Sequence, residues 1–298
     1  MVEGMDVTRE GASDAPVRIL LAHGAGAGMD HAFLAELSRL LAGPDIEVVR
    51  FNFPYMSKRA LDGKRRPPDR QPVLLAHWRE MVRAFAHPRL FLAGKSMGGR
   101  MAAELYHEGG DEMNAAGLLI LGYPFHPPAS PDRWRGEVLK QITTPTLLLQ
   151  GERDTFGSRA ELADFPFSPA VSVHWLTDGD HGFKPRKASG VSEQENLREA
   201  AERIKLATRR YAKRQRTWFR KDRRIRWIDA TDPDPAAQAA EALRPFAGGS
   251  TYFLFAIGII GTGMLFALLM GLIGGFFPAW SAMRLQPRSH PRKTSPST

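Results

Sequence analysis

The 298-residue sequence contains no cysteine. Disulfide bonds, cysteine nucleophiles and thiolate metal sites are therefore excluded, while the redox compartment stays undetermined. No H-E-x-x-H motif and no cluster of carboxylates indicates a metal site, and we expect neither a metal nor another cofactor. The N-terminal residues MVEGMDVTREGASD lack the basic and apolar regions of a signal peptide, so we expect this end of the chain in the cytoplasm.

Excess charge of either sign is absent from most of the chain. Residues 1–202 hold 24 Lys and Arg against 27 Asp and Glu, and residues 227–298 hold 5 against 4. Residues 203–226 hold 12 basic residues against one acidic residue, so this short segment produces the net charge of +9. A strongly basic segment indicates acidic partners such as nucleic acid or an anionic membrane, and we expect such partners only there.

Short β-rich runs alternate with helical runs from Val17 to about Ala201. This alternation predicts an α/β fold with a mostly parallel sheet. Loops rich in proline or charge are expected on the surface at 58–71 and 124–131. The expected strands are 17–22, 46–52, 89–93, 116–121, 146–150 and 171–176. The expected helices are 30–41, 72–86, 97–107 and 158–164, with a further helix from about 191 into the basic segment.

The five residues Gly94-Lys95-Ser96-Met97-Gly98 follow the strand RLFLA and precede an expected helix. The pattern G-x-S-x-G at such a junction is typical of a nucleophile elbow, in which the glycines permit a tight turn that exposes the serine hydroxyl. An ordinary turn is the alternative, but the preceding strand favours catalysis. We therefore predict that Ser96 is a catalytic nucleophile.

A serine nucleophile needs a base and an orienting carboxylate, in the chain order Ser, Asp or Glu, His. Asp154 and His181 each follow an expected strand, at the carboxyl ends where such sheets carry their sites. We predict that both are catalytic. A helix N-cap for Asp154 and an ordinary loop position for His181 are the alternative roles. Other nearby candidates for the acid are Glu152, Asp178 and Asp180, although Asp180 is adjacent to His181 and poorly placed to reach its imidazole.

The glycine-rich run HGAGAG at 23–28 follows the first expected strand and supplies backbone for an oxyanion hole. The backbone N–H groups of Ala25 and Met97 are the expected donors. A dinucleotide-binding fingerprint is the competing interpretation. It is excluded because no G-x-G-x-x-G is formed and the strand IEVVRFN ends without the ribose-binding acid. His126, in the loop GYPFHPP, is expected to roof the site and contact substrate.

Residues 17 to about 201 resemble a known family through six motifs in order: HGAGAG, FNFPY, GKSMGGRMAA, LGYPFHPP, LLLQGERDTFG and DHGFKPRKASG. The family comprises small bacterial α/β-hydrolase-like proteins related to the testis-expressed and histone-acetyltransferase-associated hydrolase-like proteins of eukaryotes. The resemblance implies a compact hydrolase fold without a large lid. It also implies that Ser96, Asp154 and His181 occupy the triad positions. It names no substrate.

The basic segment forms an amphipathic helix, with apolar residues at seven-residue intervals from Ile204 to Ile225. IKLATRRYAKRQRTWFRKDRRIRWIDA resembles the C-terminal end of tRNA dimethylallyltransferases, which bind RNA. The nucleotide-binding loop and catalytic core of those enzymes are absent from the sequence, so transferase activity is not implied. The residues expected to contact RNA or lipid phosphates are Arg209, Arg210, Lys213, Arg214, Arg216, Trp218 and Arg220.

Residues 245–283 carry no charge, and the stretch 251–277 exceeds the roughly 20 apolar residues that cross a bilayer. FAIGIIGTGMLFALLMGLIGGFFPAWSAMRLQP resembles the last membrane helix of ABC-transporter permeases of the lipoprotein-releasing and macrolide-export type. Transport is not implied, since one span without an ATPase cannot carry it out. Gly271 and Gly275 form a G-x-x-x-G that would pair helices or merely fill a solitary span.

The sequence therefore predicts four regions: an α/β-hydrolase domain at 1–202, a basic helical extension and linker at 203–243, a transmembrane helix within 250–280, and a disordered tail at 281–298. The predicted function is a serine hydrolase acting on an ester or related acyl bond, cytoplasmic and membrane-associated through its C-terminal segment. The alternative is a catalytically silent binding module whose extension binds RNA or anionic membrane. Three resemblances in one chain indicate a composite reading frame or a gene fusion.

Overall fold

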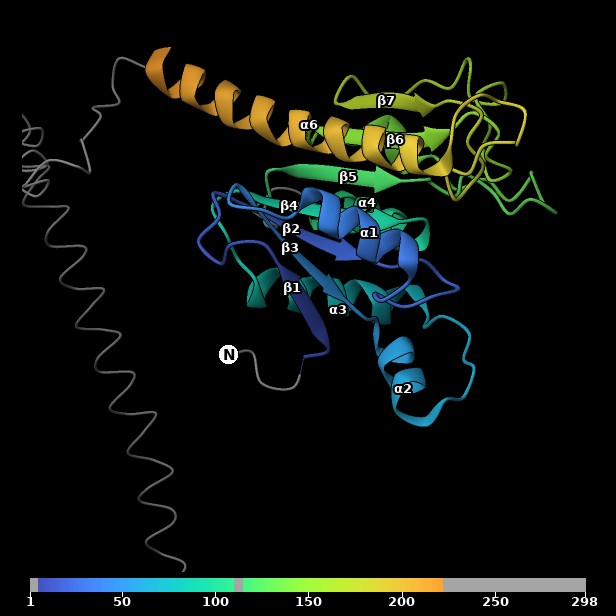
Figure 1. The fold of residues 1–298 in the computed structure, drawn as a ribbon, viewed down its shortest axis with the longest axis horizontal. Helices are drawn as coiled ribbons and strands as arrows, with labels where there is room; N and C mark the ends of the chain where they lie inside the picture. Colours follow the sequence, from blue (N-terminus) through green and yellow to red (C-terminus); the bar gives the residue numbers. More distant parts are fainter. Residues whose placement is uncertain (1–4, 110–114, 222–298) are drawn as a thin grey trace, which may run out of the picture. The chain divides into compact units, whose positions relative to one another are not determined.

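A seven-stranded sheet forms the centre of the computed structural model, which describes residues 5–109 and 115–221 (Figure 1). The strands are β1 (Val7–Glu10), β2 (Val17–Ala22), β3 (Ile46–Phe51), β4 (Leu90–Lys95), β5 (Gly117–Leu121), β6 (Thr146–Gly151) and β7 (Val171–Leu176). Their order across the sheet is β1-β3-β2-β4-β5-β6-β7. Only β1 pairs antiparallel, with β3, and the expected mostly parallel sheet is confirmed.

Helices cover both faces of this sheet (Figure 1). They are α1 (Ala32–Leu41), α2 (Pro54–Asp62), α3 (Gln71–Ala84), α4 (Met97–Gly109), α5 (Val138–Gln141) and α6 (Glu193–Lys221). One core cluster contains Leu37 of α1 and Ile204 of α6, and the other contains Trp78 of α3 and Met101 of α4. Because both faces are covered, the inner strands consist almost entirely of buried residues.

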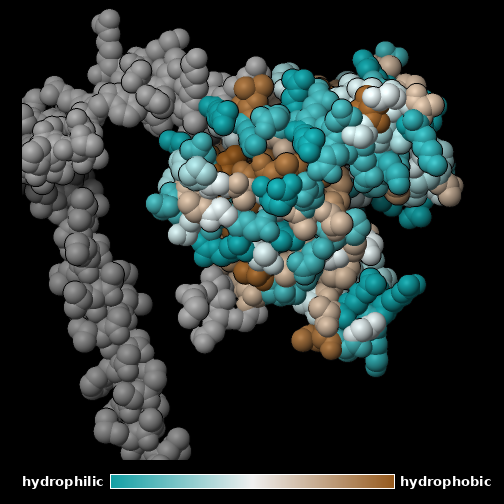
Figure 2. All heavy atoms as spheres, in the orientation of Figure 1, coloured by the Kyte–Doolittle hydropathy of each residue, from teal (hydrophilic) through white to brown (hydrophobic). Residues whose placement is uncertain are grey.

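The face that carries α1 and α6 is mostly hydrophilic, and its hydrophobic residues form small separate patches (Figure 2). Such a surface is expected where amphipathic helices turn their apolar sides to the sheet. The buried side of α6 continues past residue 202 to Ile204 and Thr208, each 1% exposed. The extension therefore begins as part of the core of this domain.

Three short elements are absent from the sequence prediction: β1, α2 and α5. The residues of α2 fall partly in the stretch 58–71, which we expected to be a loop. Pro54 occupies the first turn of α2, and Gly63 ends the helix with φ 70°. Proline in the first turn and glycine just after the last turn are common at helix boundaries. The many charged residues of the stretch led us to expect a loop instead.

The helix expected at 158–164 is wrong. This segment forms turns, in which the N–H and hydroxyl of Ser158 both donate to the Glu161 carboxylate at 2.7 Å. The N–H of Leu162 donates to the Ser158 carbonyl at 3.1 Å, which closes one helical turn. Pro166 follows closely and disfavours helical geometry at the residue before it, so the helix does not continue.

The chain divides into two compact units, Met1–Trp218 and Phe219–Thr298. Within residues 5–109 and 115–221, no helix combines the length and apolar content that a membrane crossing requires. The segments expected to form the transmembrane helix and the tail, 250–280 and 281–298, lie outside the described residues. Among the residues expected to contact RNA or lipid, Arg209 is exposed on α6, and the side chains of the other six lie outside the described part.

Candidate active site

Ser96 lies in a strained turn between β4 and α4. Its φ angle is 52°, a left-handed conformation that residues other than glycine seldom adopt. Glycine is required on both sides because the chain segments approach closely. A Cβ on Gly94 would lie 2.3 Å from the backbone of Gly98 and Gly99, and a Cβ on Gly98 would lie 2.6 Å from the His23 carbonyl oxygen. This is the tight turn that the G-x-S-x-G pattern predicts, and it directs the serine hydroxyl to the carboxyl edge of the sheet.

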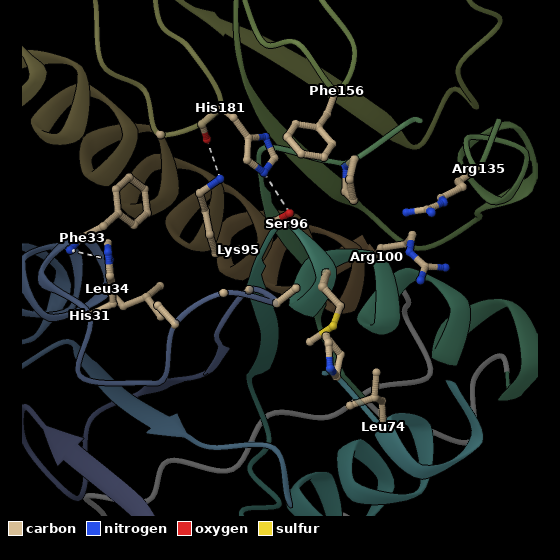
Figure 3. A pocket seen from close by; sticks show the side chains of 18 of the residues that line it. His31, Phe33, Leu34, Leu74, Lys95, Ser96, Arg100, Arg135, Phe156 and His181 are labelled. Atoms are coloured by element: carbon tan, nitrogen blue, oxygen red, sulfur yellow. Dashed lines mark hydrogen bonds between the residues drawn. The ribbon is translucent and has the colours of Figure 1, made fainter. Parts of the chain in front are cut away.

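The structure brings Ser96, His181 and Asp154 together from three parallel strands. His181 Nε2 lies 2.8 Å from Ser96 Oγ, and His181 Nδ1 lies 2.8 Å from Asp154 Oδ2. Because an ionised carboxylate only accepts hydrogen bonds, Nδ1–H donates to Asp154, which leaves Nε2 to accept from the serine hydroxyl. Figure 3 shows the His181 ring turned toward Ser96 over the cavity.

Asp154 is fully buried, and three donors hold its carboxylate. Oδ2 accepts from Gln150 Nε2 at 2.9 Å as well as from His181, and Oδ1 accepts from the Phe156 N–H at 2.8 Å. The Phe156 ring lies against the His181 imidazole, with centroids 4.2 Å apart. These contacts fix both the carboxylate and the imidazole plane before any substrate arrives.

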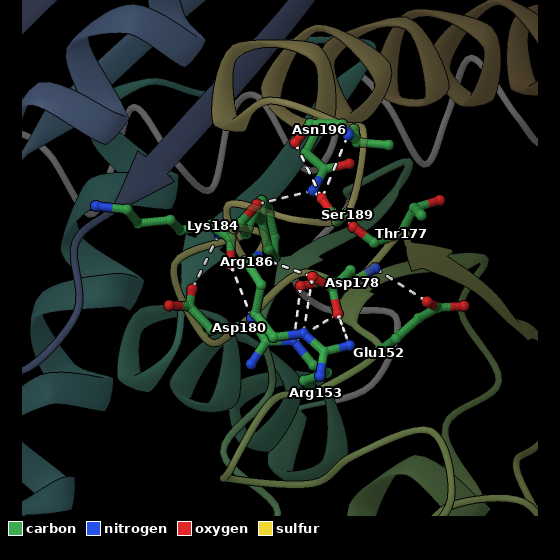
Figure 4. Close-up of polar contacts among 11 residues, drawn as sticks. Glu152, Arg153, Thr177, Asp178, Asp180, Lys184, Arg186, Ser189 and Asn196 are labelled. Atoms are coloured by element: carbon green, nitrogen blue, oxygen red, sulfur yellow. Dashed lines mark hydrogen bonds and ion pairs between the residues drawn. The ribbon is translucent and has the colours of Figure 1, made fainter.

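The other three acids considered from the sequence have different partners (Figure 4). The Glu152 carboxylate accepts from the Asp178 N–H at 2.9 Å, which lowers the pKa of Glu152. Asp178 pairs with Arg153 and Arg186, and Arg186 holds the Asp178 pKa below its usual range. Asp180 accepts from two backbone N–H groups in its own loop. These contacts shape the loop that carries His181, whereas Asp154 alone among the four acids contacts the imidazole.

His23 anchors the glycine-rich loop and is completely buried. Its Nε2 accepts from the Phe53 N–H at 3.0 Å, and its Nδ1 lies 2.7 Å from the Gly24 carbonyl oxygen, to which Nδ1–H donates. Burial lowers the pKa of His23 from 6.5 to about 4, so the ring is neutral near pH 7. The loop is thereby tied to the chain after β3.

Ala25 and Met97 line the same cavity as Ser96, and Met97 opens α4. In the described part of the chain, neither backbone N–H donates to another protein group. Both donors are free to bind a ligand oxygen near Ser96. Their position fits the expected oxyanion hole, and that role stays a prediction.

Lys95 is a site residue that the sequence prediction missed. Its ammonium donates to the His181 carbonyl oxygen and lies 5.8 and 5.5 Å from the ring centroids of Phe33 and Phe183. Burial lowers the pKa of Lys95 to about 8, although Asp154 and Asp180 oppose the change. Lys95 thus joins the turn at Ser96 directly to the loop that carries His181. No sequence signal reveals this contact, because it depends on packing between segments 86 residues apart.

A cavity of about 730 Å³ opens beside these residues (Figure 3). Its lining includes Ala25, Ser96, Met97, Phe156 and His181, together with apolar side chains from α1 and α3. Among residues 5–109 and 115–221, no three His, Asp or Glu side chains gather as a metal site would require.

His126 is not among the residues that line this cavity. Its side chain is buried, its Nδ1 lies 3.0 Å from the Pro127 carbonyl oxygen, and its Nε2 lies 3.4 Å from Glu161. Its ring also stacks on Trp134. The structure therefore gives His126 a packing role in its loop, and we do not propose it as a substrate contact.

Comparisons with known proteins agree with this architecture. The family model described as "Alpha/beta hydrolase domain" matches residues 15–208. The solved structure of Est1E from Butyrivibrio proteoclasticus with ferulic acid is similar with a TM-score of 0.50 and 12% identity, covering 68% of this chain and 95% of that one. An alpha-beta serine hydrolase homologue from Coxiella burnetii has a TM-score of 0.46 and 19% identity, covering 68% of this chain and 89% of that one. At 12% identity, the likeness to the Est1E structure shows the fold alone.

A different relative matches only a short stretch. The tRNA dimethylallyltransferase of Corynebacterium jeikeium (strain K411) is 62% identical over 45 residues, which are 15% of this chain and 14% of that protein. The match supports the expected resemblance to these enzymes. The enzyme of Corynebacterium efficiens is 30% identical over 198 residues, which are 59% of this chain and 62% of that protein, so the chain spans less than two thirds of the length of these relatives. The family match covers most of the chain and includes every residue of the cavity described above. The chain therefore belongs to the family defined by the alpha/beta hydrolase domain.

Proposed function

We propose that the protein is a serine hydrolase that cleaves an ester or related acyl bond. The observation that carries the proposal is the chain of two 2.8 Å contacts from Asp154 through His181 to Ser96, at the edge of a 730 Å³ cavity. An unassisted serine hydroxyl is a weak nucleophile, and a neighbouring imidazole activates it by accepting its proton. Family membership supports the same class of reaction.

In the proposed reaction, Ser96 Oγ attacks the acyl carbon as its proton passes to His181 Nε2. The negative charge that develops on the carbonyl oxygen is stabilised by the N–H groups of Ala25 and Met97, each worth about 3 to 4 kcal/mol in such sites. His181 then gives the proton to the leaving alkoxide, and an acyl-serine remains. Water attacks that ester with His181 as the base, releases the acid and restores the Ser96 hydroxyl. Asp154 keeps the imidazole oriented and stabilises its protonated form.

Hydrolysis of 4-nitrophenyl acetate tests this proposal directly. We expect the intact protein to release nitrophenolate and the Ser96→Ala variant to lose at least about a thousandfold in kcat, because the nucleophile is removed. The Ser57→Ala variant is a suitable control, because Ser57 lies on α2 and does not line the cavity. Equal rates for wild type and Ser96→Ala would reject the proposal.

A further inference from the structure

Two arginines lie on the same side of the cavity, beyond Ser96 and away from Lys95 (Figure 3). Arg100 extends from α4, and Arg135 comes from the segment between β5 and α5. Both side chains are partly buried, and both line the space that Ser96 opens into. Two cationic groups beside a proposed nucleophile need a partner, because like charges that share a partly buried region repel each other.

Arg100 is held close to the reacting position by the helix itself. It lies one turn after the nucleophile, and its N–H donates to the Ser96 carbonyl oxygen at 3.0 Å. In the described part of the chain the guanidinium pairs with one anion, Glu104, at a long distance of 3.7 Å. Its Nε is buried and has no hydrogen-bond partner within the described residues. A buried donor without an acceptor is costly, so this group is poised to bind an anionic oxygen.

Arg135 is positioned by its backbone. Its N–H donates to the Phe125 carbonyl oxygen and its carbonyl accepts from the Tyr123 hydroxyl, both at 2.7 Å. Both of those aromatic residues are fully buried. In the part of the chain that the structure describes, the Arg135 guanidinium forms no ion pair. Burial lowers the pKa of Arg135, and the charges of Arg100 and Arg133 lower it further.

The other charged groups of the cavity are engaged or exposed. The Lys95 ammonium is bound by the His181 carbonyl oxygen and two aromatic rings. The Asp69 carboxylate accepts from the Tyr55 N–H at 2.9 Å, and Glu193 is exposed at the start of α6. Arg100 and Arg135 are the two arginines of the lining, and their guanidinium groups have donors left to offer a ligand.

We infer that the substrate is an ester bearing an anionic oxygen group, a carboxylate or a phosphate, that binds Arg100 and Arg135 while its acyl carbon lies at Ser96. A guanidinium fork matches the paired oxygens of either group, and such charge-assisted bonds are stronger than neutral ones. The inference deepens the proposed function and relies on it for the position of the cleaved bond.

Two esters that differ only in charge test the inference by kinetics. They are 4-nitrophenyl glutarate, which keeps a free carboxylate, and its methyl ester. We expect kcat/KM to be at least about tenfold higher for the charged ester, the size of one hydrogen bond to a charged group. Arg100→Gln and Arg135→Gln should each lower the preference for the charged ester over the methyl ester, measured as the ratio of their kcat/KM values, by about that factor. Arg133→Gln is the matched control, because Arg133 is exposed and does not line the cavity.

A binding measurement separates this inference from the proposed catalysis. Glutaric acid monoanilide and its uncharged N-methylamide contain no ester bond, and calorimetry with the intact protein gives their Kd values. Binding that is about tenfold tighter for the free acid and that depends on the two arginines supports the inference, whether or not the nitrophenyl esters are cleaved. If neither nitrophenyl ester is cleaved, only the proposed function is rejected. Equal Kd values for the two anilides, or values unaffected by both arginine variants, overturn the inference. Competition by glutarate or by inorganic phosphate in the same assay distinguishes a carboxylate from a phosphate ligand.

Discussion

Asp154 accepts three hydrogen bonds while fully buried, so its replacement tests whether the carboxylate charge matters. Asp154→Asn keeps the size of the side chain but offers an amide N–H to His181, which favours the wrong imidazole tautomer. We predict that kcat for 4-nitrophenyl acetate falls by about 10³ to 10⁴ with KM little changed. Steady-state kinetics at pH 7.5 measure both values.

Glu152→Gln provides the comparison for this variant. The glutamine oxygen can still accept from the Asp178 N–H, and Glu152 does not contact His181. We expect its kcat to remain within a few-fold of wild type. A loss in Glu152→Gln as large as that in Asp154→Asn would show that Asp154 has no special role.

The lowered pKa of His23 predicts how the free energy of unfolding depends on pH. Its pKa is about 4 in the folded protein against 6.5 when exposed, so the unfolded chain binds the extra proton first as the pH falls. The contribution of neutral His23 is complete above about pH 6.5 and is lost progressively toward pH 4. A shift of this size corresponds to about 3 kcal/mol. Urea unfolding at pH 7 and pH 4.5 measures the change in free energy of unfolding.

Removing the titrating group should remove this part of the pH dependence. His23→Asn can still hydrogen-bond but does not titrate, so its free energy of unfolding should change less between pH 7 and pH 4.5 than that of wild type. His107→Asn should behave as wild type, because His107 is exposed on α4. If His23→Asn and wild type lose the same free energy over this interval, the assigned pKa is wrong.

The contact between α4 and the glycine-rich loop is tested by two glycine substitutions. A Cβ on Gly98 would lie 2.6 Å from the His23 carbonyl oxygen and 2.9 Å from Ala22, whereas a Cβ on Gly26 would have no atom within 4 Å. We predict that Gly98→Ala lowers the free energy of unfolding by about 1 to 3 kcal/mol through overpacking. Gly26→Ala should change it by less than about 0.5 kcal/mol. Denaturant titration of the two variants checks this, and equal stabilities would contradict the observed packing.

Much of the element pattern could be predicted from the sequence. Buried parallel strands are continuous apolar runs, and the six expected strands all appear with bounds shifted by at most two residues. The helix expected at 158–164 is wrong, because Pro166 follows closely and the segment forms turns. The tight turn at Ser96 was predictable because Gly94 and Gly98 lie where neighbouring backbone segments leave no room for a side chain. The role of Lys95 was not, since it depends on a contact with His181, 86 residues away in the sequence.

The sequence favours Asp154 as the carboxylate that orients His181, but it leaves three other acids nearby as candidates. All four lie near the carboxyl ends of β6 and β7, and only the fold determines which one faces His181. The same reasoning applies to Arg100 and Arg135, which are ordinary basic residues until the cavity brings them together. Local patterns therefore indicate candidate residues, and tertiary packing selects among them.

At the scale of the whole molecule, α6 links the hydrolase-like domain to the basic extension. Leu197, Ala200 and Ile204 of α6 are buried in one of the two cores. We predict that a chain of residues 1–221 keeps the melting temperature and the esterase rate of the full protein. A chain of residues 1–190 should fail to fold, because it exposes that core. Thermal unfolding followed by circular dichroism tests both, and a cooperative transition in residues 1–190 would contradict the role given to α6.

The central claim is that Ser96 is the nucleophile, and mapping a covalent adduct tests it most directly. The intact protein is treated with a fluorophosphonate, digested, and analysed by mass spectrometry while residual hydrolysis of 4-nitrophenyl acetate is followed. We expect one adduct per chain, located on Ser96, with activity lost in proportion to labelling and with no adduct in His181→Ala. An unlabelled Ser96 in a protein that still hydrolyses the ester, or an inactivating adduct on another residue, would contradict it.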